Sequence, residues 1–271
     1  MQSPKIRIVI AGSTGIIGGQ IKQFLEKEDY EVHSPTRHEL LTEIRRIKPE
    51  CILNCIGAGM DYRKNQSESE IWTANYEVPM QLVRLAQELE CKFITIGTLL
   101  EKVEGFDSPY IDSKRAFSEF LLTSSEVSLD FSVLQAPIVF GIKPEHALLS
   151  EILESSQRHK SVQLESPYAI RDFIHILDLS RVIEHLVKDK KAGGRVFEVG
   201  SGKGYLLSRL CENVLRERVN PAWIFLNNKR TNVFEVIADL TTLESEFNFK
   251  VEYDLESWLA SEIARLEVES I

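Results

Sequence analysis

The sequence lacks the features of membrane, secreted and metal-binding proteins. No apolar run approaches the roughly 18 residues that a membrane span needs, and the first residues do not form a signal-peptide pattern. The four cysteines fit no CxxC or zinc spacing, and the six histidines form no HxH or HExxH cluster. We therefore expect a cytoplasmic protein with reduced thiols, no metal site and no membrane partner.

The chain also has fewer basic than acidic residues. Lys plus Arg is 32 and Asp plus Glu is 41, which leaves a net charge of −9 over 271 residues. This balance disfavours nucleic acid or an anionic membrane as the main partner, because both attract positive charge. It still permits a small anionic ligand, which needs only a local group of donors. The hydrophobic content of 43% is typical of a globular chain with a sizeable core.

In the first half of the sequence, short apolar runs alternate with stretches of helical spacing. The runs that predict strands are Ile6–Ile10, Glu31–His33, Cys51–Ile56, Lys92–Ile96 and Asp130–Gln135. The stretches that predict helices are Gly18–Glu28, Leu40–Ile47, Ala74–Glu90 and Ser113–Ser124. This order predicts an α/β fold, a doubly wound parallel sheet with helices on both faces.

The pattern changes after Gly141, where the predicted elements are shorter and more polar. They are helices at Lys143–His159, Asp178–Val187 and Leu206–Arg216, and strands at Arg171–Ile176 and Val196–Val199. These elements indicate a smaller C-terminal lobe. We assign residues 1–141 and about 173–192 to a nucleotide-binding domain, and about 142–172 with 193–271 to a substrate-binding lobe.

The most informative segment joins the first predicted strand to the first predicted helix. Glycines stand at positions 12, 15 and 18 of this segment. Gly12 permits a sharp turn, Gly15 permits close approach of a pyrophosphate, and Gly18 permits close packing of the helix against the strand. Free N–H groups and the positive end of the helix dipole attract phosphate. The segment therefore predicts a dinucleotide-binding turn, rather than a tight turn without a ligand.

The tip of the second predicted strand bears on which dinucleotide binds. An NAD enzyme usually has Asp or Glu at this tip, where it accepts hydrogen bonds from the ribose hydroxyls. Here the tip reads Ser34-Pro35-Thr36-Arg37-His38, with no acid before Glu39. Arg37 could bind a 2′-phosphate, because a guanidinium matches phosphate geometry, or it could be a solvated surface arginine. We therefore favour NADP (as NADPH), with NAD as the alternative.

Tyr110 and Lys114 form a Tyr-x-x-x-Lys pair after the fourth predicted strand. On a helix, residues i and i+4 lie on the same face. A phenol, whose pKa is about 10, transfers protons poorly at neutral pH, and a neighbouring ammonium lowers that pKa by stabilising the phenolate. The pair therefore predicts a proton-transfer site, and a chance pair on a surface helix is the alternative.

The GxxGxxG turn and the Tyr-x-x-x-Lys pair together resemble the extended short-chain dehydrogenase/reductase family, of the NAD-dependent epimerase/dehydratase type. The matching positions run from about residue 6 to residue 210. The resemblance implies a Rossmann-type fold with Thr98, Tyr110 and Lys114 as catalytic residues, and Thr95 as the alternative hydroxyl. It also implies a set of cofactor contacts: Gly12, Thr14, Gly15, Ile16, Ile17, Gly18, Arg37, Cys55, Ile56, Gly57, Asn75, Tyr110, Lys114, Pro137 and Ile138.

Further positions that resemble the family concern the substrate. Arg171 lies in an Arg-Asp-Phe-Ile-His segment that, in the family, borders the diphosphate of a nucleotide sugar. The resemblance implies substrate contacts from Thr98, Tyr110 and Arg171, with residues 60–72 beside the sugar. Gln135 departs from the family pattern, as does Phe140, because arginine and tyrosine are common at these positions.

An N-cap role is considered for two residues of this part of the sequence. Asn75 matches a family asparagine, but an ordinary helix N-cap is the alternative. Asp178 we predict as the N-cap of the helix that follows it.

The short Thr98–Tyr110 segment and the compact length resemble nucleotide-sugar 4-ketoreductases of the CDP-abequose and CDP-paratose synthase type. This implies NADPH-dependent reduction of a 4-keto-6-deoxy sugar nucleotide, as in polysaccharide biosynthesis, with Tyr110 as proton donor. A 4-epimerase with the same three residues is the alternative. A dehydratase is less favoured, because Leu99 and Leu100 rather than an acidic pair follow Thr98.

Two hypotheses from other classes remain. Residues Val196–Gly204 imitate the loop of an S-adenosylmethionine-dependent methyltransferase, but too few residues follow for the rest of such a sheet. A non-catalytic nucleotide-binding protein on the same fold is the other. The resemblance also implies a homodimer through the helices Ala74–Glu90 and Ser113–Ser124, with Phe117, Phe120 and Leu121 facing either that interface or the monomer core.

Overall fold

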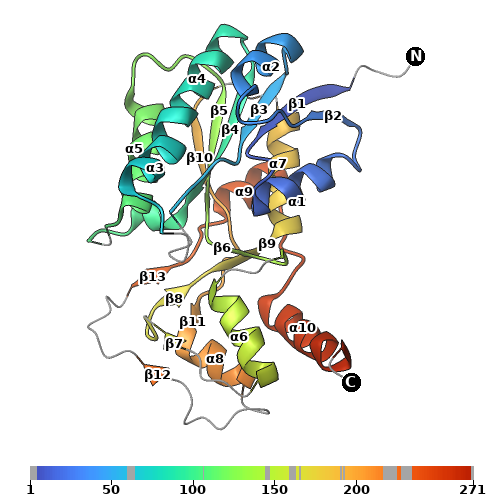
Figure 1. The fold of residues 1–271 in the computed structure, drawn as a ribbon, viewed down its shortest axis with the longest axis vertical. Coiled ribbons are helices and arrows are strands. Elements are labelled where there is room, and N and C mark those ends of the chain that lie inside the picture. The colour runs from blue at the N-terminus through green and yellow to red at the C-terminus, as the bar shows by residue number, and fades with distance from the viewer. Residues whose placement is uncertain are drawn as a thin grey trace. The chain divides into compact units, whose positions relative to one another are not determined.

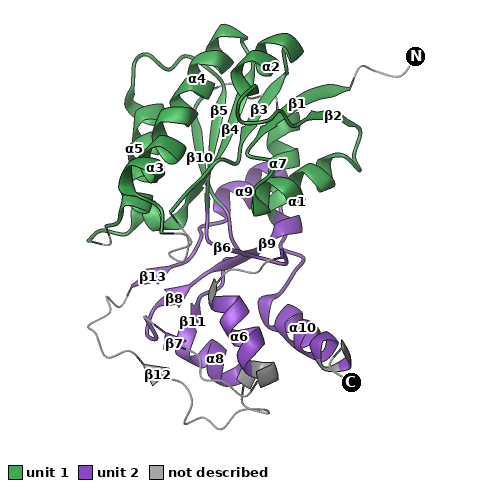
Figure 2. Cartoon of the chain, viewed as in Figure 1, with its two compact units in different colours: residues 1–135, 179–198 green, residues 136–178, 199–271 purple. Residues whose placement is uncertain are grey.

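The computed structural model describes two compact units. The described residues are 5–59, 65–105, 107–143, 147–158, 163–164, 166–189, 191, 193–215, 225–226 and 234–269. Unit 1 comprises residues 1–135 and 179–198, and unit 2 comprises residues 136–178 and 199–271 (Figure 2). Within these described ranges, no helix combines the length and apolar character that a membrane crossing requires. The assignment of one unit to the cofactor and the other to the substrate stays a prediction.

Unit 1 contains a six-stranded parallel sheet, which confirms the predicted α/β fold. The strand order is β10-β5-β4-β3-β1-β2. The strands are β1 (Ile6–Ala11), β2 (Tyr30–His33), β3 (Cys51–Asn54), β4 (Lys92–Thr98), β5 (Phe131–Ala136) and β10 (Arg195–Glu198). The sheet order places β1 between β2 and β3, so the connections that follow β1 and β3 run in opposite directions. Ligands of such sheets bind at this switch point, outside the carboxyl ends of the strands.

Helices cover both faces of the sheet in unit 1. On one face lie α4 (Val78–Glu88) and α5 (Pro109–Thr123), and on the other lie α1 (Ile16–Leu25) and the part of α7 (Ile176–Lys188) that belongs to this unit (Figure 1). All four residues of β3 are buried because both of its faces are covered. The core toward α2 (Leu40–Ile47), α4 and α5 includes Val9, Ile52, Phe93, Val133, Leu82, Phe117 and Leu121.

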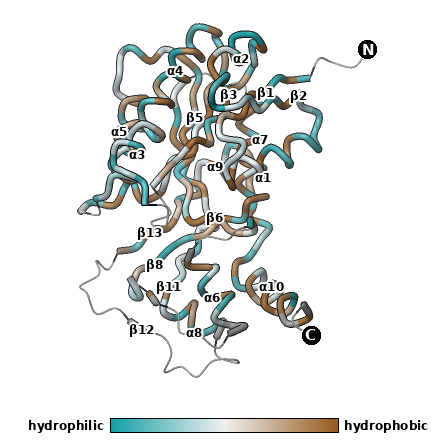
Figure 3. The backbone as a smooth tube through the Cα atoms, in the orientation of Figure 1, coloured by the Kyte–Doolittle hydropathy of each residue, from teal (hydrophilic) through white to brown (hydrophobic). Residues whose placement is uncertain are grey.

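The helix after β3 begins earlier than predicted and is not uniform. It runs as α3 (Glu68–Trp72), the π-helical turn η2 (Thr73–Glu77) and α4, whereas the pattern predicted Ala74–Glu90. A capping box at Ser67 fixes the earlier start, since the Ser67 hydroxyl accepts the Glu70 N–H and the Glu70 carboxylate accepts the Ser67 N–H. In Figure 3, hydrophilic residues interrupt this region, whereas hydrophobic residues recur along β1, β3 and β5.

Helix α5 also starts earlier than predicted, at Pro109 rather than Ser113. Ser108 is its N-cap, with the hydroxyl accepting the Ile111 N–H at 3.3 Å, and a proline suits the first helical position. Phe117 and Leu121 are buried in the core of unit 1, so the monomer core rather than an interface takes these two side chains. The homodimer itself stays a prediction.

Unit 2 is assembled from short strand pairs and four helices among its described residues. β6 (Ile138–Phe140) pairs with β9 (Phe173–His175), and β8 (Ile170–Arg171) pairs with β11 (Tyr205–Leu206) and β13 (Glu235–Val236). The remaining pair is β7 (Gln163–Leu164) with β12 (Phe225–Leu226). The helices are α6 (Ala147–Arg158), α8 (Leu207–Leu215), α9 (Thr241–Phe247) and α10 (Leu255–Glu269). Its apolar core includes Phe140, Leu149, Ile152, Phe173, Leu210 and Leu259.

Two buried carboxylates correct the sequence predictions in unit 2. Asp172 separates β8 from β9, where a single strand was predicted, and its oxygens accept hydrogen bonds from the backbone N–H groups of Phe173, Ser201, Gly202 and Ala238. The prediction of Asp178 as an N-cap is wrong, because α7 begins at Ile176. Its carboxylate instead accepts the N–H groups of Glu252 and Tyr253 at 3.3 and 3.2 Å.

Phe93→Ala tests the core of unit 1. The Phe93 side chain is fully buried, and its ring meets the Phe117 ring edge to face with centroids 6.3 Å apart. We expect the substitution to lower the free energy of unfolding by about 3–5 kcal/mol, because it leaves a cavity between the sheet and α5. Denaturant unfolding measures this, and the exposed Leu122→Ala on α5 should change it by less than about 0.5 kcal/mol. Equal effects of the two substitutions would contradict this packing.

Candidate functional site

The turn after β1 packs directly on the end of β3. Gly12 has φ +88°, and a Cβ at this position would lie 2.8 Å from the carbonyl carbon of Cys55 and the nitrogen of Ile56. The Cys55 N–H donates to the carbonyl of Ala11 at 2.8 Å, which joins the two strand ends. Only glycine satisfies both the positive φ and the close backbone approach.

The same turn leaves the start of α1 open. A Cβ on Gly18 would lie 2.4 Å from the Gly12 carbonyl oxygen, so the first turn of α1 packs against this turn as predicted. Gly15 is the N-cap residue, and no described side chain caps the helix. Thr14, Gly15 and Ile16 are exposed and Ile17 is half-buried. No side chain among the described residues caps the first N–H groups of α1 at its positive dipole end, as an anion-binding position requires.

A buried amide positions the loop after β3. Asn54 at the end of β3 accepts the Ile56 N–H at 3.1 Å and donates to the Thr95 hydroxyl at 3.0 Å. These bonds fix the half-buried Cys55 and Ile56 beside the exposed Gly57. They also give the Thr95 hydroxyl a structural partner.

Asn75 clamps the same loop from the π-helical turn η2. Its side chain is fully buried and accepts the Ala58 N–H at 2.9 Å, while its amide nitrogen donates to the Ala58 carbonyl and the Ser113 hydroxyl at 2.9 and 3.0 Å. The Ser113 hydroxyl in turn donates to the Tyr110 carbonyl at 3.0 Å. Asn75 is therefore no N-cap, and it links the loop after β3 to α5. π-Helical turns of this kind are frequent at functional sites.

Thr98 ends β4, and Tyr110 lies in the first turn of α5. The Thr98 side chain is buried, the Tyr110 side chain is half-buried, and Thr98 lies close enough to the phenol to affect its pKa. Burial raises the pKa of the Tyr110 phenol above its ordinary value, and the nearby Glu101 charge raises it further, whereas the Thr98 side chain lowers it. The structure therefore brings Tyr110 together with Thr98 and not with the alternative, Thr95.

Lys114 lies one helical turn after Tyr110, and its side chain is buried. Its Nζ donates to the carbonyl oxygen of Ile96 on β4 at 2.8 Å. Burial lowers the pKa of Lys114, while the charges of Glu101 and Cys55 oppose that shift. We predicted that this ammonium brings the pKa of Tyr110 toward neutral. That prediction is wrong for this structure, in which burial and a carboxylate raise the pKa of the phenol.

Glu101 is the site residue that sequence reasoning missed. It lies in the 3-10 turn η3 (Leu99–Lys102), and its buried carboxylate accepts the Thr98 N–H at 2.7 Å and the Gln135 Nε2–H at 3.2 Å. A Cβ on Gly97 would lie 2.5 Å from Oε1, so a glycine is needed beside it. The signal was the capping-box spacing Thr98-x-x-Glu101.

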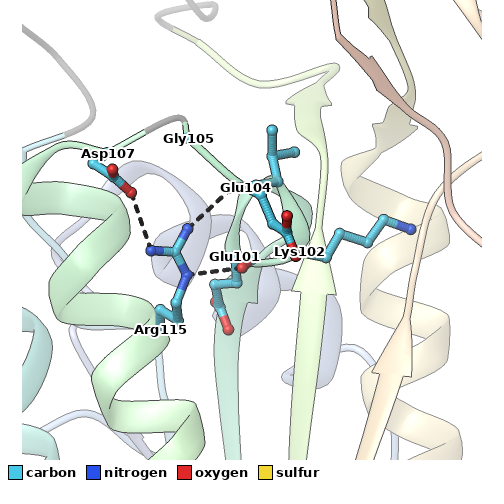
Figure 4. Close-up of a pocket in the computed structure, with 7 residues that line it drawn as sticks. Glu101, Lys102, Glu104, Gly105, Asp107 and Arg115 are labelled. Atoms are coloured by element: carbon cyan, nitrogen blue, oxygen red, sulfur yellow. Dashed lines mark hydrogen bonds and ion pairs between the residues drawn. The ribbon is translucent and has the colours of Figure 1, made fainter.

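A surface hollow of about 310 Å³ lies beside this turn, lined by residues 101–105, Asp107 and Arg115. Figure 4 shows the Arg115 guanidinium at its centre, held by the carbonyl oxygens of Glu101 and Val103 at 2.9 and 3.2 Å and by the Asp107 carboxylate at 3.4 Å. Because the Arg115 guanidinium anchors the loop by donating to these three acceptors, we assign the hollow a structural role.

The remaining predicted residues are Arg37 of unit 1 and three residues of unit 2. Arg37 is exposed after β2. Pro137, Ile138 and Arg171 belong to unit 2, and their roles toward the residues of unit 1 stay predictions. Arg171 stacks on the Phe234 ring at 4.3 Å, and burial lowers its pKa to about 10. Of the predicted sugar-binding segment, residues 60–64 lie outside the described residues.

In the methyltransferase-like loop, backbone N–H groups already donate hydrogen bonds within the protein. The N–H groups of Ser201 and Gly202 donate to the Asp172 carboxylate, and a Cβ on Gly200 would lie 2.3 Å from Oδ2 of Asp172. The strand that precedes the loop, β10, is at the edge of the sheet rather than at its switch point. The loop therefore has a structural role. Within the part of the chain that the structure describes, no three His, Cys, Asp or Glu side chains group as a metal ion would require.

Comparison with known proteins finds one family and many similar folds. The family model described as "NAD dependent epimerase/dehydratase family" matches residues 8–200. A comparison with the curated proteins found no match. The enzyme WbmG from Bordetella bronchiseptica, in complex with NAD, is similar at 16% identity and TM-score 0.80, covering 97% of this chain and 94% of that chain.

Two further solved structures are similar over their full length. The UDP-glucose 4-epimerase of Thermotoga maritima with UDP-glucose has 17% identity and TM-score 0.75, covering 98% of this chain and 100% of that chain. The dTDP-4-dehydrorhamnose reductase of Bacillus anthracis in complex with NADP has 14% identity and TM-score 0.76, covering 99% of this chain and 100% of that chain. At sequence identities this low, the structural similarity establishes the fold of this chain and nothing about its activity.

Asn75→Ala tests the clamp between η2 and the loop after β3. Removing the amide leaves the buried polar groups of Ala58 without their partner, so we expect the free energy of unfolding to fall by about 3 kcal/mol. Thr73→Ala is the matched control in the same turn, because its hydroxyl bonds only the exposed Glu77 carboxylate among the described contacts. A loss no larger than that of the control, in denaturant unfolding, would rule out the clamp.

Proposed function

The chain belongs to the NAD dependent epimerase/dehydratase family, and from this we propose that it is an NADPH-dependent reductase of a 4-keto-6-deoxy nucleotide sugar. The observation that carries the proposal is the placement of Tyr110 near Thr98 at the carboxyl end of β4, with the buried Lys114 bonded to the same strand. A 4-epimerase that uses the same three residues is the second candidate. The resemblance to the CDP-abequose and CDP-paratose synthase type stays a prediction.

The residues of unit 1 fit a dinucleotide. The glycine turn (Gly12, Gly15 and Gly18) packs closely on the backbone at the end of β3, at the switch point of the sheet. The start of α1 would present its N–H groups to a pyrophosphate there. Cys55, Ile56 and Gly57 would face the nucleoside, since their loop is fixed beside this cradle. Structures of similar fold hold NAD in WbmG and NADP in the Bacillus anthracis reductase.

When bound, a reduced nicotinamide supplies a hydride to the substrate carbonyl carbon. Tyr110 donates its phenolic proton to the carbonyl oxygen, which becomes a hydroxyl group. The Thr98 hydroxyl would orient that oxygen, since Thr98 lies close to the Tyr110 phenol. Lys114, desolvated and held at the Ile96 carbonyl, would bind the nicotinamide ribose.

Elimination of water from the sugar is disfavoured by how Glu101 is bound. A dehydratase needs an acid and a base free to act on the substrate. Both carboxylate oxygens of Glu101 accept protein donors, namely the Thr98 N–H and the Gln135 amide. The Glu101 carboxylate, the first acidic residue after Thr98, is thus bound within the protein, which supports reduction or epimerisation over dehydration.

Unit 2 supplies the candidate for substrate binding. The Arg171 guanidinium is desolvated and stacked on Phe234, and burial lowers its pKa to about 10. A diphosphate would stabilise such a cation with two parallel hydrogen bonds. The Thermotoga maritima epimerase, of similar fold, was solved with UDP-glucose. We therefore propose a nucleotide sugar as the substrate class.

Turnover with and without Tyr110→Phe tests the reaction. A panel of 4-keto-6-deoxy nucleotide sugars is mixed with NADPH, and we expect one of them to cause stoichiometric loss of NADPH absorbance. Tyr110→Phe should lower kcat by about 100- to 10 000-fold, because the proton donor is gone. Tyr30→Phe is the control, since Tyr30 starts β2 at the opposite edge of the sheet and bonds Glu184. Sugar isomerisation without net NADPH loss would instead identify the epimerase.

Arg37→Ala tests the choice of dinucleotide. Arg37 is exposed at the tip of β2, where no acid precedes Glu39, so we expect about tenfold weaker binding of NADPH and unchanged binding of NADH. Fluorescence titration of each reduced dinucleotide measures both. Arg46→Ala is the matched control, because Arg46 is exposed on α2 and pairs with Glu43. Equal weakening for NADH and NADPH would show that Arg37 meets no 2′-phosphate.

A further inference from the structure

Glu101 is a buried carboxylate beside two catalytic candidates, and nothing in the reaction proposed above uses it directly. It sits in the η3 turn, packed against Gly97 of β4 so closely that a Cβ there would lie 2.5 Å from Oε1. Burying a carboxylate costs free energy unless it is hydrogen-bonded, and here it is bonded on both oxygens. A buried carboxylate bonded in this way indicates that its position or its charge contributes to the site.

Its first effect is geometric. Oε1 accepts the Thr98 N–H at 2.7 Å while the Thr98 hydroxyl accepts the Leu100 N–H at 3.3 Å, so the strand end and the turn hold each other. Oε2 accepts the Gln135 amide of β5 at 3.2 Å, which ties the turn to the next strand of the sheet. The backbone carbonyl of Glu101 is fixed as well, by Arg115 of α5 at 2.9 Å. The orientation of Thr98 toward Tyr110 therefore depends on Glu101.

Its second effect is electrostatic. Two described groups act on the Tyr110 phenol, Thr98 from β4 and Glu101 from η3, and the Glu101 charge also acts on Lys114. The Lys114 ammonium is bonded to the Ile96 carbonyl and desolvated. The Glu101 charge disfavours a second negative charge on the phenol, because like charges in a desolvated site repel strongly.

We propose that Glu101 is a positioning residue that fixes Thr98 through the strand end and keeps the Tyr110 phenol protonated. This inference rests on the proposed reductase function. Only the protonated phenol can donate to a carbonyl oxygen. An ordinary phenol is already protonated at neutral pH, so the Glu101 charge extends the reducing form of the enzyme to more alkaline pH. The reverse step, in which a phenolate removes a proton from an alcohol, then requires a higher pH.

Glu101→Gln separates the charge from the position. The glutamine oxygen can still accept the Thr98 N–H, and Gln135 can rotate its amide to present an acceptor to the new NH₂ group. Phenolate absorbance of each protein is measured as pH rises, within the range where circular dichroism shows native structure. Subtracting the same protein with Tyr110→Phe isolates Tyr110 from the other six of the seven tyrosines. We expect ionisation to begin about one pH unit lower in Glu101→Gln than in the parent.

Two further variants serve as controls for this measurement. Glu104→Gln removes the same charge from the same loop at an exposed position, so the onset of ionisation should stay within about 0.3 pH unit of the parent. Gly97→Ala keeps the Glu101 charge but forces its carboxylate away from the Thr98 N–H. The kcat of this variant for reduction should fall about tenfold at every pH, because loss of the bond between Glu101 and the Thr98 N–H would misplace the Thr98 hydroxyl.

The outcomes decide each part of the inference. An unchanged onset in Glu101→Gln, or an equal shift in Glu104→Gln, overturns the electrostatic part. An unchanged kcat in Gly97→Ala overturns the positioning part, whether or not Glu101→Gln folds. In reduction assays, the loss of activity with rising pH should begin at a lower pH in Glu101→Gln than in the parent. The absorbance measurement needs no substrate, so a parent enzyme without turnover would refute the proposed function separately.

Discussion

The close contact between the turn after β1 and the end of β3 determines how the site of unit 1 can be built. Gly12 and Gly18 leave no room for a Cβ at this contact, which holds two backbones together at the switch point of the sheet. Because α1 begins at this turn without a side-chain cap from the described residues, none of their side chains uses its first N–H groups. The loop after β3 must then pass beside the same place, where the amides of Asn54 and Asn75 hold it.

Buried polar side chains, in addition to apolar packing, connect the elements that carry the site. Asn75 joins the loop after β3 to α5 through Ser113, Lys114 joins α5 to β4, and Glu101 joins β4 to β5. Each of these bonds ends on a backbone group or on a side chain that is itself bonded. A hydrogen-bonded group in a low-dielectric interior has few alternative positions. The site residues are therefore fixed relative to the sheet, as proton transfer over hydrogen-bond distance requires.

The sequence could predict the parts of the fold that follow from local pattern. The strands, the glycine turn and the positions of Thr98, Tyr110 and Lys114 depend on alternation, spacing and chain order, which are visible without a structure. Helix starts at Ser67 and Ser108 were missed because caps outside the apolar pattern set them. The π-helical turn around Asn75 and the ties of Asp178 and Asp172 could not be predicted, since their partners are distant in the chain.

Glu101 shows why spacing alone misjudges an acidic residue. A dehydratase-like acid is sought directly after the catalytic hydroxyl, yet a 3-10 turn returns the third residue onward to the strand end. There the carboxylate accepts the backbone N–H of Thr98, and its charge raises the pKa values of both Tyr110 and Lys114. Burial raises the pKa of the phenol, and the Glu101 charge raises it further. The Lys114 ammonium instead donates its hydrogen bond to the Ile96 carbonyl oxygen of β4.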